Sequence, residues 1–239
     1  MPLEKMDKNA YSEHWSLESD NLESKGIYER LAEITPTEKT LEIGGGSGIS
    51  TRHLAQKRQV LSIESNDLLL RKAKSSLEGQ GLDVKFLYAD VFELSQEHVS
   101  NIKAFSPKGI VCWFIGSHAD HYIKYTPDTP SIFDKPKKYR ENIEDALLSQ
   151  NLCPESIEWI HLANRGAIVD LERDKAASAT ADDYNTHVFL PNGFEVVSVE
   201  ILDWDRNGSD FIYVNGKNPN LASGSQTPSV VSILARRKN

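Results

Sequence analysis

Three acidic side chains stand where short apolar segments end. Glu42 comes two residues before a glycine-rich stretch at 44–48, Glu64 closes the next apolar segment, and Asp90 closes the third. Carboxylates accept hydrogen bonds from hydroxyl and amino groups, and glycines let a ligand approach main-chain atoms closely. A carboxylate at position 42 repels a phosphate but attracts an ammonium or sulfonium group. We therefore expect a ligand with a cationic end. A carboxylate at Glu64 can accept from both hydroxyls of a ribose, as the acid about 20 residues on does in dinucleotide folds, and one at Asp90 can accept from an adenine amino group.

Two histidines and an aspartate follow the fourth apolar segment within four residues: His118, Asp120 and His121. A histidine there can take a proton from a hydroxyl or an amine near neutral pH, so these three are the candidate catalytic residues. The same His-x-Asp-His spacing is compatible with metal ligation, and a polar surface loop would have a similar composition. We assign catalysis and no metal, and the other two readings stay open as alternatives.

The spacing of the glycines narrows the choice of ligand. Gly44, Gly46 and Gly48 lie between an expected strand and an expected helix. A dinucleotide-binding loop would need its third glycine at position 49, which is Ile49. A phosphate-binding loop would need a following Gly-Lys-Ser/Thr, which the sequence lacks. A nicotinamide-dependent enzyme is therefore disfavoured.

Alternating strands and helices must position these residues. Five apolar segments are typical of strands, with helical patterns between several of them: residues 40–43, 59–63, 84–88, 108–114 and 167–171. This alternation predicts an α/β fold with a mostly parallel sheet and helices on both faces. The last two expected strands, 194–202 and 229–235, have no helical pattern between them and should pair antiparallel.

The remaining segments give weaker expectations. Residues 1–21 should be irregular, 155–164 helical, and Arg165-Gly166 a turn, and a hairpin is expected at 211–216. His161 would then lie on a helix.

We expect a single domain over residues 1–239, because the length suits one domain and no internal repeat is present. An N-terminal helical or lid segment would occupy 1–37. The core would occupy 38–239, with insertions at 117–136 and 203–228.

The glycine loop and the two later acids together resemble the class I S-adenosylmethionine-dependent methyltransferases. The resemblance implies a Rossmann-like seven-stranded sheet whose last two strands form an antiparallel pair, and S-adenosyl-L-methionine as cofactor. It also implies roles: Glu42, Gly44, Gly46 and Gly48 would hold the methionine part, Glu64 the ribose, Asp90 and Val91 the adenine. The main chain at Phe114 and Ile115 would line the methionine end, and Tyr11, His14 and Trp15 could close over the cofactor.

Net charge and composition limit which kind of methyl acceptor and which cellular compartment we expect. The 239 residues carry a net charge of −8, which argues against a large nucleic-acid footprint, although a basic run occurs at 135–140. Two cysteines form no disulfide framework, and neither a membrane-spanning run nor a signal peptide is evident, so we expect a cytoplasmic protein. We expect a monomer or homodimer that methylates an O or N atom of a small molecule. A protein or RNA acceptor and a non-catalytic methyltransferase-like binding domain are the alternatives.

Overall fold

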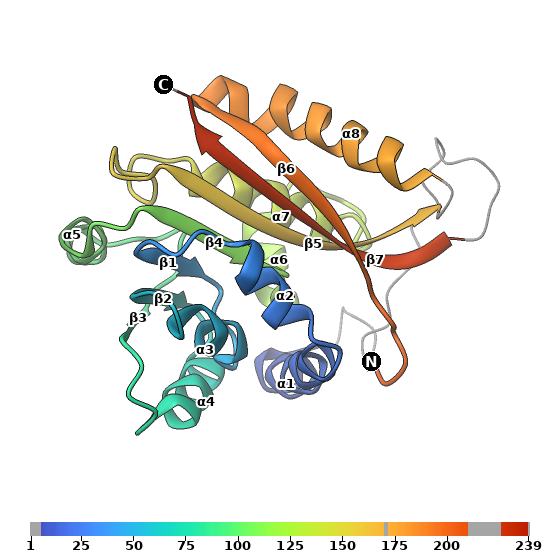
Figure 1. The fold of residues 1–239 in the computed structure, drawn as a ribbon. Helices are drawn as coiled ribbons and strands as arrows, with labels where there is room; N and C mark the ends of the chain where they lie inside the picture. The colour runs from blue at the N-terminus through green and yellow to red at the C-terminus, as the bar shows by residue number, and fades with distance from the viewer. Residues whose placement is uncertain (1–5, 170–171, 210–225, 239) are drawn as a thin grey trace.

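The computed structural model describes residues 6–169, 172–209 and 226–238. Within them the chain forms a seven-stranded sheet in the order β3-β2-β1-β4-β5-β7-β6 (Figure 1). The first five strands run parallel, and β7 pairs antiparallel with both β5 and β6. The strands are β1 Thr40–Ile43, β2 Val60–Glu64, β3 Val84–Tyr88, β4 Gly109–Trp113, β5 Trp159–Val169, β6 Phe194–Asp203 and β7 Gln226–Arg237. The expected sheet, with its antiparallel last pair, is confirmed.

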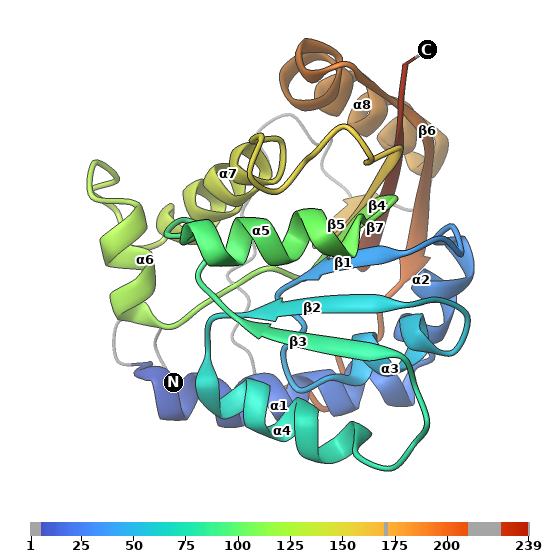
Figure 2. The same cartoon turned by 90° about the vertical axis from the view of Figure 1, so that its left-hand side faces the viewer.

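Helices cover both faces of the sheet (Figure 2). One face carries α1 Lys8–Ser24, α2 Ile27–Ile34, α3 Ile49–Ala55 and α4 Asp67–Leu77. The other carries α5 Gln96–Phe105, α6 Ala119–Tyr125, α7 Lys135–Leu147 and α8 Arg173–Tyr184. No helix in the described parts of the chain is long and apolar enough to cross a membrane.

Strand alternation divides the apolar core between these two helical layers. Leu41, Ile43 and Ile63 pack on the side of α5 and α7. Val60 and Val111 point to the opposite side and pack with α1 to α4. Because neighbouring residues of a strand face opposite ways, Glu42 must point toward the second layer, away from the side taken by Leu41 and Ile43.

The strand β5 corrects three expectations. Residues 155–164 were expected to be helical and Arg165-Gly166 to be a turn, but β5 runs through both. Its whole length pairs with β7, and its first half also pairs with β4 and is buried on both faces. A strand buried on both sides has a continuous apolar pattern that periodicity cannot distinguish from a buried helix. His161 accordingly lies in this strand and not on a helix.

The N-terminal region corrects another expectation. Residues 8–24, expected to be largely irregular, form the helix α1, which buries Tyr11, Trp15 and Leu22. Only these few apolar residues carry the helical period, and buried polar residues such as Ser12 interrupt the pattern. The insertion at 117–136 contains α6 and the start of α7, whereas the hairpin expected at 211–216 lies outside the described residues.

Candidate functional site

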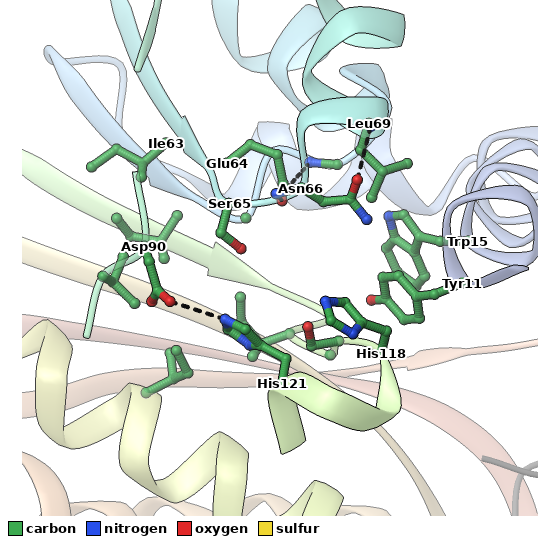
Figure 3. A pocket seen from close by; sticks show the side chains of 18 of the residues that line it. Tyr11, Trp15, Ile63, Glu64, Ser65, Asn66, Leu69, Asp90, His118 and His121 are labelled. Atoms are coloured by element: carbon green, nitrogen blue, oxygen red, sulfur yellow. Dashed lines mark hydrogen bonds and ion pairs between the residues drawn. The ribbon is translucent and has the colours of Figure 1, made fainter. Parts of the chain in front are cut away.

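A pocket opens at the carboxyl ends of β1, β2 and β4 (Figure 3). Parallel α/β sheets bind ligands at this edge, because the loops that follow the strands converge there. Most of the residues expected to bind the cofactor line it: Gly44, Gly46, Glu64, Asp90, Val91, Phe114 and Ile115. His118 and His121 also line the pocket, whereas Glu42, Gly48 and Asp120 are not among its lining residues.

Gly44 and Gly46 shape the floor of the pocket. Both have positive φ angles, +75° and +56°, which glycine adopts without strain. A Cβ on Gly46 would lie 2.5 Å from Nε1 of Trp15, and one on Gly44 would lie 2.8 Å from Cδ1 of Ile115. Because these two glycines have no side chains, the indole of Trp15 and the side chain of Ile115 can pack directly on the loop.

Gly48 serves packing within the fold. It is the N-cap of α3 with a φ of +89°, and a Cβ there would lie 2.9 Å from Ala73 of α4. The close approach of α3 and α4 thus requires this glycine. Gly48 therefore differs in role from Gly44 and Gly46, which line the pocket.

The carboxylate of Glu42 turns beneath the glycine loop. Its Oε1 accepts a hydrogen bond from Ser50 at 2.6 Å and its Oε2 accepts one from Thr51 at 2.5 Å, both in the first turn of α3. Burial raises the pKa of this carboxyl, and these hydroxyls oppose the rise. In this arrangement Glu42 fixes the loop against α3 and is not among the residues that line the pocket.

Glu64 bridges the end of β2 and the glycine loop. Its Oε2 accepts from the backbone N–H of Gly46 at 2.9 Å, and its Oε1 accepts from that of Asn66 at 2.7 Å. Burial raises the pKa of Glu64, while these backbone donors lower it. Each carboxylate oxygen keeps a further lone pair, so the side chain can still accept hydrogen bonds from a pair of hydroxyl groups.

Asp90 follows β3, the strand next to the one that ends in Glu64, and it contacts α6 (Figure 3). Its Oδ2 accepts from Nε2 of His121 at 3.0 Å and from the hydroxyl of Tyr125 at 2.6 Å. Its Oδ1 accepts from the backbone N–H of Phe92 at 3.0 Å. Burial alone would raise the pKa of Asp90, but these hydrogen bonds outweigh it and hold the pKa at about 2. The side chain is therefore a carboxylate at neutral pH.

His118 lies between Asp90 and α1 in the pocket wall (Figure 3). Its Nδ1 is buried and has no hydrogen-bond partner among the described residues. Burial, followed by the neighbouring His121, lowers the pKa of His118 below its ordinary value of 6.5. A neutral imidazole with an unused ring nitrogen can accept a proton or a hydrogen bond from a bound molecule.

The chain segment before His118 is strained. Phe114, the first residue after β4, has a φ of +56°, which is rare for an aromatic residue. Its backbone N–H donates to Ala163 at 2.8 Å, and its ring packs edge-on against Tyr28. Strain held in place by such packing is characteristic of functional sites. Here it directs the following residues, Ile115 to His118, into the pocket.

The helix α1 covers the pocket, and two of the three residues expected to close over it, Tyr11 and Trp15, are in the lining. The backbone N–H of Ala119 donates to Met6 at 3.0 Å, which joins the start of α1 to the start of α6. On the other side, the amide of Asn66 donates to Ser12 at 2.8 Å. The N-terminal segment that contains Met6 and α1 is thus hydrogen-bonded to α6 on one side of the pocket and to Asn66 on the other.

Sequence reasoning did not identify several lining residues, including Lys8, Asn66, Ser117 and Tyr139. Asn66 is the N-cap of α4, and its side chain accepts from the backbone N–H of Leu68 at 3.0 Å. Tyr139 and Ile143 stand one turn apart on α7, and that spacing was a usable signal. The described residues hold no group of three or more His, Cys, Asp or Glu side chains suited to a metal ion.

The residues fit the cofactor that the resemblance implies. The loop offers main-chain atoms where Gly44 and Gly46 lack side chains, and Glu64 and Asp90, at the ends of two adjacent strands, line the same pocket. His118 lines the same pocket, and its buried Nδ1 has no hydrogen-bond partner among the described residues. These groups suit a ligand with hydroxyl, amino and cationic parts.

Comparisons with known proteins give local matches in sequence. No protein-family model matches the chain. A 23S rRNA (uracil(1939)-C(5))-methyltransferase of Polynucleobacter necessarius is 40% identical over 75 residues, 30% of this chain and 16% of that protein. A protein-L-isoaspartate O-methyltransferase of Salinibacter ruber is 41% identical over 61 residues, 25% of this chain and 26% of that protein. The chain therefore spans only a minor part of either relative.

One solved structure carries the comparison of folds. A candidate RNA methyltransferase from Pyrococcus horikoshii superposes with a TM-score of 0.51, covering 91% of this chain and 85% of that one at 10% identity. At this identity the likeness concerns the fold alone. The strand order and directions are those of the Rossmann-like class I methyltransferase fold.

Proposed function

We propose that the chain is an S-adenosylmethionine-dependent methyltransferase that acts on an O or N atom of a small molecule. The observation that carries this is the meeting of Gly44, Gly46, Glu64 and Asp90 in one pocket at the carboxyl edge of the sheet. The local sequence matches to two methyltransferases support the same reaction class.

The cofactor, when bound, supplies a methyl group on a positively charged sulfur, which is inherently ready for displacement. The main chain around Gly44 and Gly46 would hold its methionine part. Glu64 would accept from the ribose hydroxyls, and Asp90 from the adenine amino group, with the backbone N–H of Val91 donating to the ring. The protein's main contribution is alignment of the two reacting atoms.

His118 is the residue we propose as proton acceptor. It follows the strained segment after β4, its ring faces the pocket, and its Nδ1 is unused within the described residues. The lowered pKa keeps the imidazole neutral at pH 7, as a base must be. Removing a proton from a hydroxyl or amine as it attacks is worth about 10²–10⁴-fold in rate.

Two observations favour a small acceptor. The helix α1 lies over the pocket, Ser12 of this helix accepts from Asn66, and Met6 just before the helix accepts from Ala119 of α6. The basic run at 135–140 is also engaged within the protein: Lys135 donates to the Thr126 carbonyl at 2.5 Å, and Arg140 pairs with Glu144 at 3.5 Å. Basic side chains that are already paired within the protein are poorly placed to bind the phosphates of a nucleic acid.

A macromolecular acceptor is the second candidate, because one local match is to an rRNA methyltransferase and the other to a protein methyltransferase. The experiment is incubation with methyl-labelled S-adenosylmethionine and, in separate reactions, a metabolite extract, total RNA and unfolded protein. We expect label in the metabolite fraction, with turnover nearly independent of salt. Label in RNA, with a steep loss between 50 and 200 mM salt, would replace the small-molecule acceptor. Tight cofactor binding without label in any fraction would indicate a non-catalytic binding domain.

A further inference from the structure

His121 is connected at both ring nitrogens. Nε2 lies 3.0 Å from Oδ2 of Asp90, and Nδ1 lies 3.0 Å from the hydroxyl of Tyr139. A carboxylate can only accept, so the proton of neutral His121 sits on Nε2, and Nδ1 accepts from Tyr139. Burial raises the pKa of Tyr139 well above its ordinary value, so this phenol keeps its proton and remains a donor. His121 therefore has no ring nitrogen left for a substrate proton.

The hydrogen bonds to Asp90 leave a specific acceptor site. A carboxylate offers about four lone-pair positions. His121 and Tyr125 occupy the two on Oδ2, and the backbone N–H of Phe92 occupies one on Oδ1. One position on Oδ1 remains. It can accept a hydrogen from an amino group and would repel a carbonyl oxygen placed there.

The same contacts fix α6. His121 and Tyr125 are four residues apart, so they share one face of this short helix and hold it against Asp90. His118 is the N-cap of α6. The position of His118 at the pocket wall and the orientation of Asp90 therefore depend on one seven-residue helix.

We propose that His121 is a positioning residue that orients Asp90 to read the 6-amino group of the bound purine, and that this docks α6 with His118 at the other end of the pocket. The role replaces the catalytic one expected from the sequence, and it rests on the proposed function. His121 acts through Asp90 and does not touch the reacting atoms.

The test compares two ligands that differ at the purine 6-position: S-adenosylhomocysteine, which bears an amino group, and S-inosylhomocysteine, which bears an oxygen. Isothermal titration of the full chain should show the wild type preferring the amino ligand by at least about tenfold, because the oxygen ligand leaves Asp90 facing an acceptor. His121→Phe should reduce this preference severalfold. His121→Gln, whose amide can donate to Asp90 and accept from Tyr139, should restore most of it.

Controls separate positioning from loss of structure. Ile123 is on the same helix with a 53% exposed side chain, so Ile123→Ala should keep the preference. Adding His121→Phe to Asp90→Ala should change it no further, because the residue through which His121 acts is already gone. Hydrogen exchange should show S-adenosylhomocysteine protecting the amides of α6 in the wild type and in His121→Gln, and protecting them less in His121→Phe.

Three results would overturn the proposal. The first is a preference that persists in His121→Phe. The second is an equal weakening of both ligands without rescue by Gln, and the third is additivity of the two substitutions in the double variant. Failure of the wild type to bind either ligand would instead defeat the proposed function itself. The binding result for the unmodified chain therefore distinguishes the two failures.

Discussion

The backbone N–H of Gly46 donates to Oε2 of Glu64 at 2.9 Å, so the loop after β1 is joined to the end of β2 through a buried carboxylate. The second oxygen of this carboxylate accepts from the backbone N–H of Asn66, the N-cap of α4. Glu64 thus both shapes the glycine loop and presents its remaining lone pairs to the pocket. Loss of this side chain should disturb a ligand at two points at once.

Glu64→Ala should weaken the binding of S-adenosylmethionine by about 1–3 kcal/mol, the usual range for lost hydrogen bonds to a charged group. Isothermal titration measures the affinity directly. Glu29 is exposed on α2, and Glu29→Ala serves as the matched control that should bind as the wild type does. An unchanged affinity in Glu64→Ala would remove this residue from the ribose site.

His118→Ala should lower kcat by about 10²–10⁴-fold while the affinity for S-adenosylmethionine stays near that of the wild type. In the wild type, activity should fall on the acid side with a midpoint below 6.5, because burial lowers the pKa of His118 and only its neutral form accepts a proton. The acid-side fall should disappear from the residual activity of the variant.

The assay needs the acceptor found by the labelling experiment, and kcat is followed from pH 5 to 8. His187, whose side chain is 71% exposed, supplies the control substitution His187→Ala. Full activity in His118→Ala, or an acid limb that survives in it, would exclude His118 as the proton acceptor.

The cluster of acids could be predicted because neighbouring parallel strands bring their carboxyl ends to one edge, so Glu64 and Asp90 had to meet there. The direction of Glu42 could not be predicted from that rule. Strand alternation alone was insufficient, since the hydroxyls of Ser50 and Thr51 decide where its carboxylate goes. The hydrogen bonds from His121 and Tyr139 depend on how α6 and α7 pack, which no local pattern encodes.

The same reason explains the error in β5. Trp159, His161 and Ala163 are each at most 1% exposed, because β5 lies between β4 and β7 and is covered by helices. A polar residue such as His161 is accommodated there by two hydroxyl partners that lie far away in the sequence. Only tertiary contacts distinguish this segment from a helix.

Gly48→Ala should destabilise the fold by about 2–4 kcal/mol, from a strained left-handed conformation together with overpacking against Ala73 and Leu77. Gly79→Ala provides the comparison, because Gly79 also has a positive φ but has open space around its Cα. It should cost only about 1 kcal/mol. Urea unfolding of both variants isolates the packing contribution, and equal losses would show that α3 and α4 can separate without cost.

The buried imidazole of His161 should make the fold sensitive to acid. Its Nδ1 lies 2.7 Å from the hydroxyl of Thr35 and its Nε2 lies 2.7 Å from that of Ser232, while burial, followed by the charge of Arg58, lowers its pKa to about 3. The unfolded chain regains the ordinary value of 6.5 and therefore binds more protons between about pH 3 and 6.5. The free energy of unfolding should fall as the pH drops below 6.5, by up to about 1.4 kcal/mol per pH unit from this group.

Urea unfolding at pH 7.5, 6.5 and 5.5 measures this slope. In His161→Gln, which cannot take up a proton, the slope should be smaller even though the variant is less stable at pH 7.5, and an unchanged slope would assign the acid sensitivity to other groups.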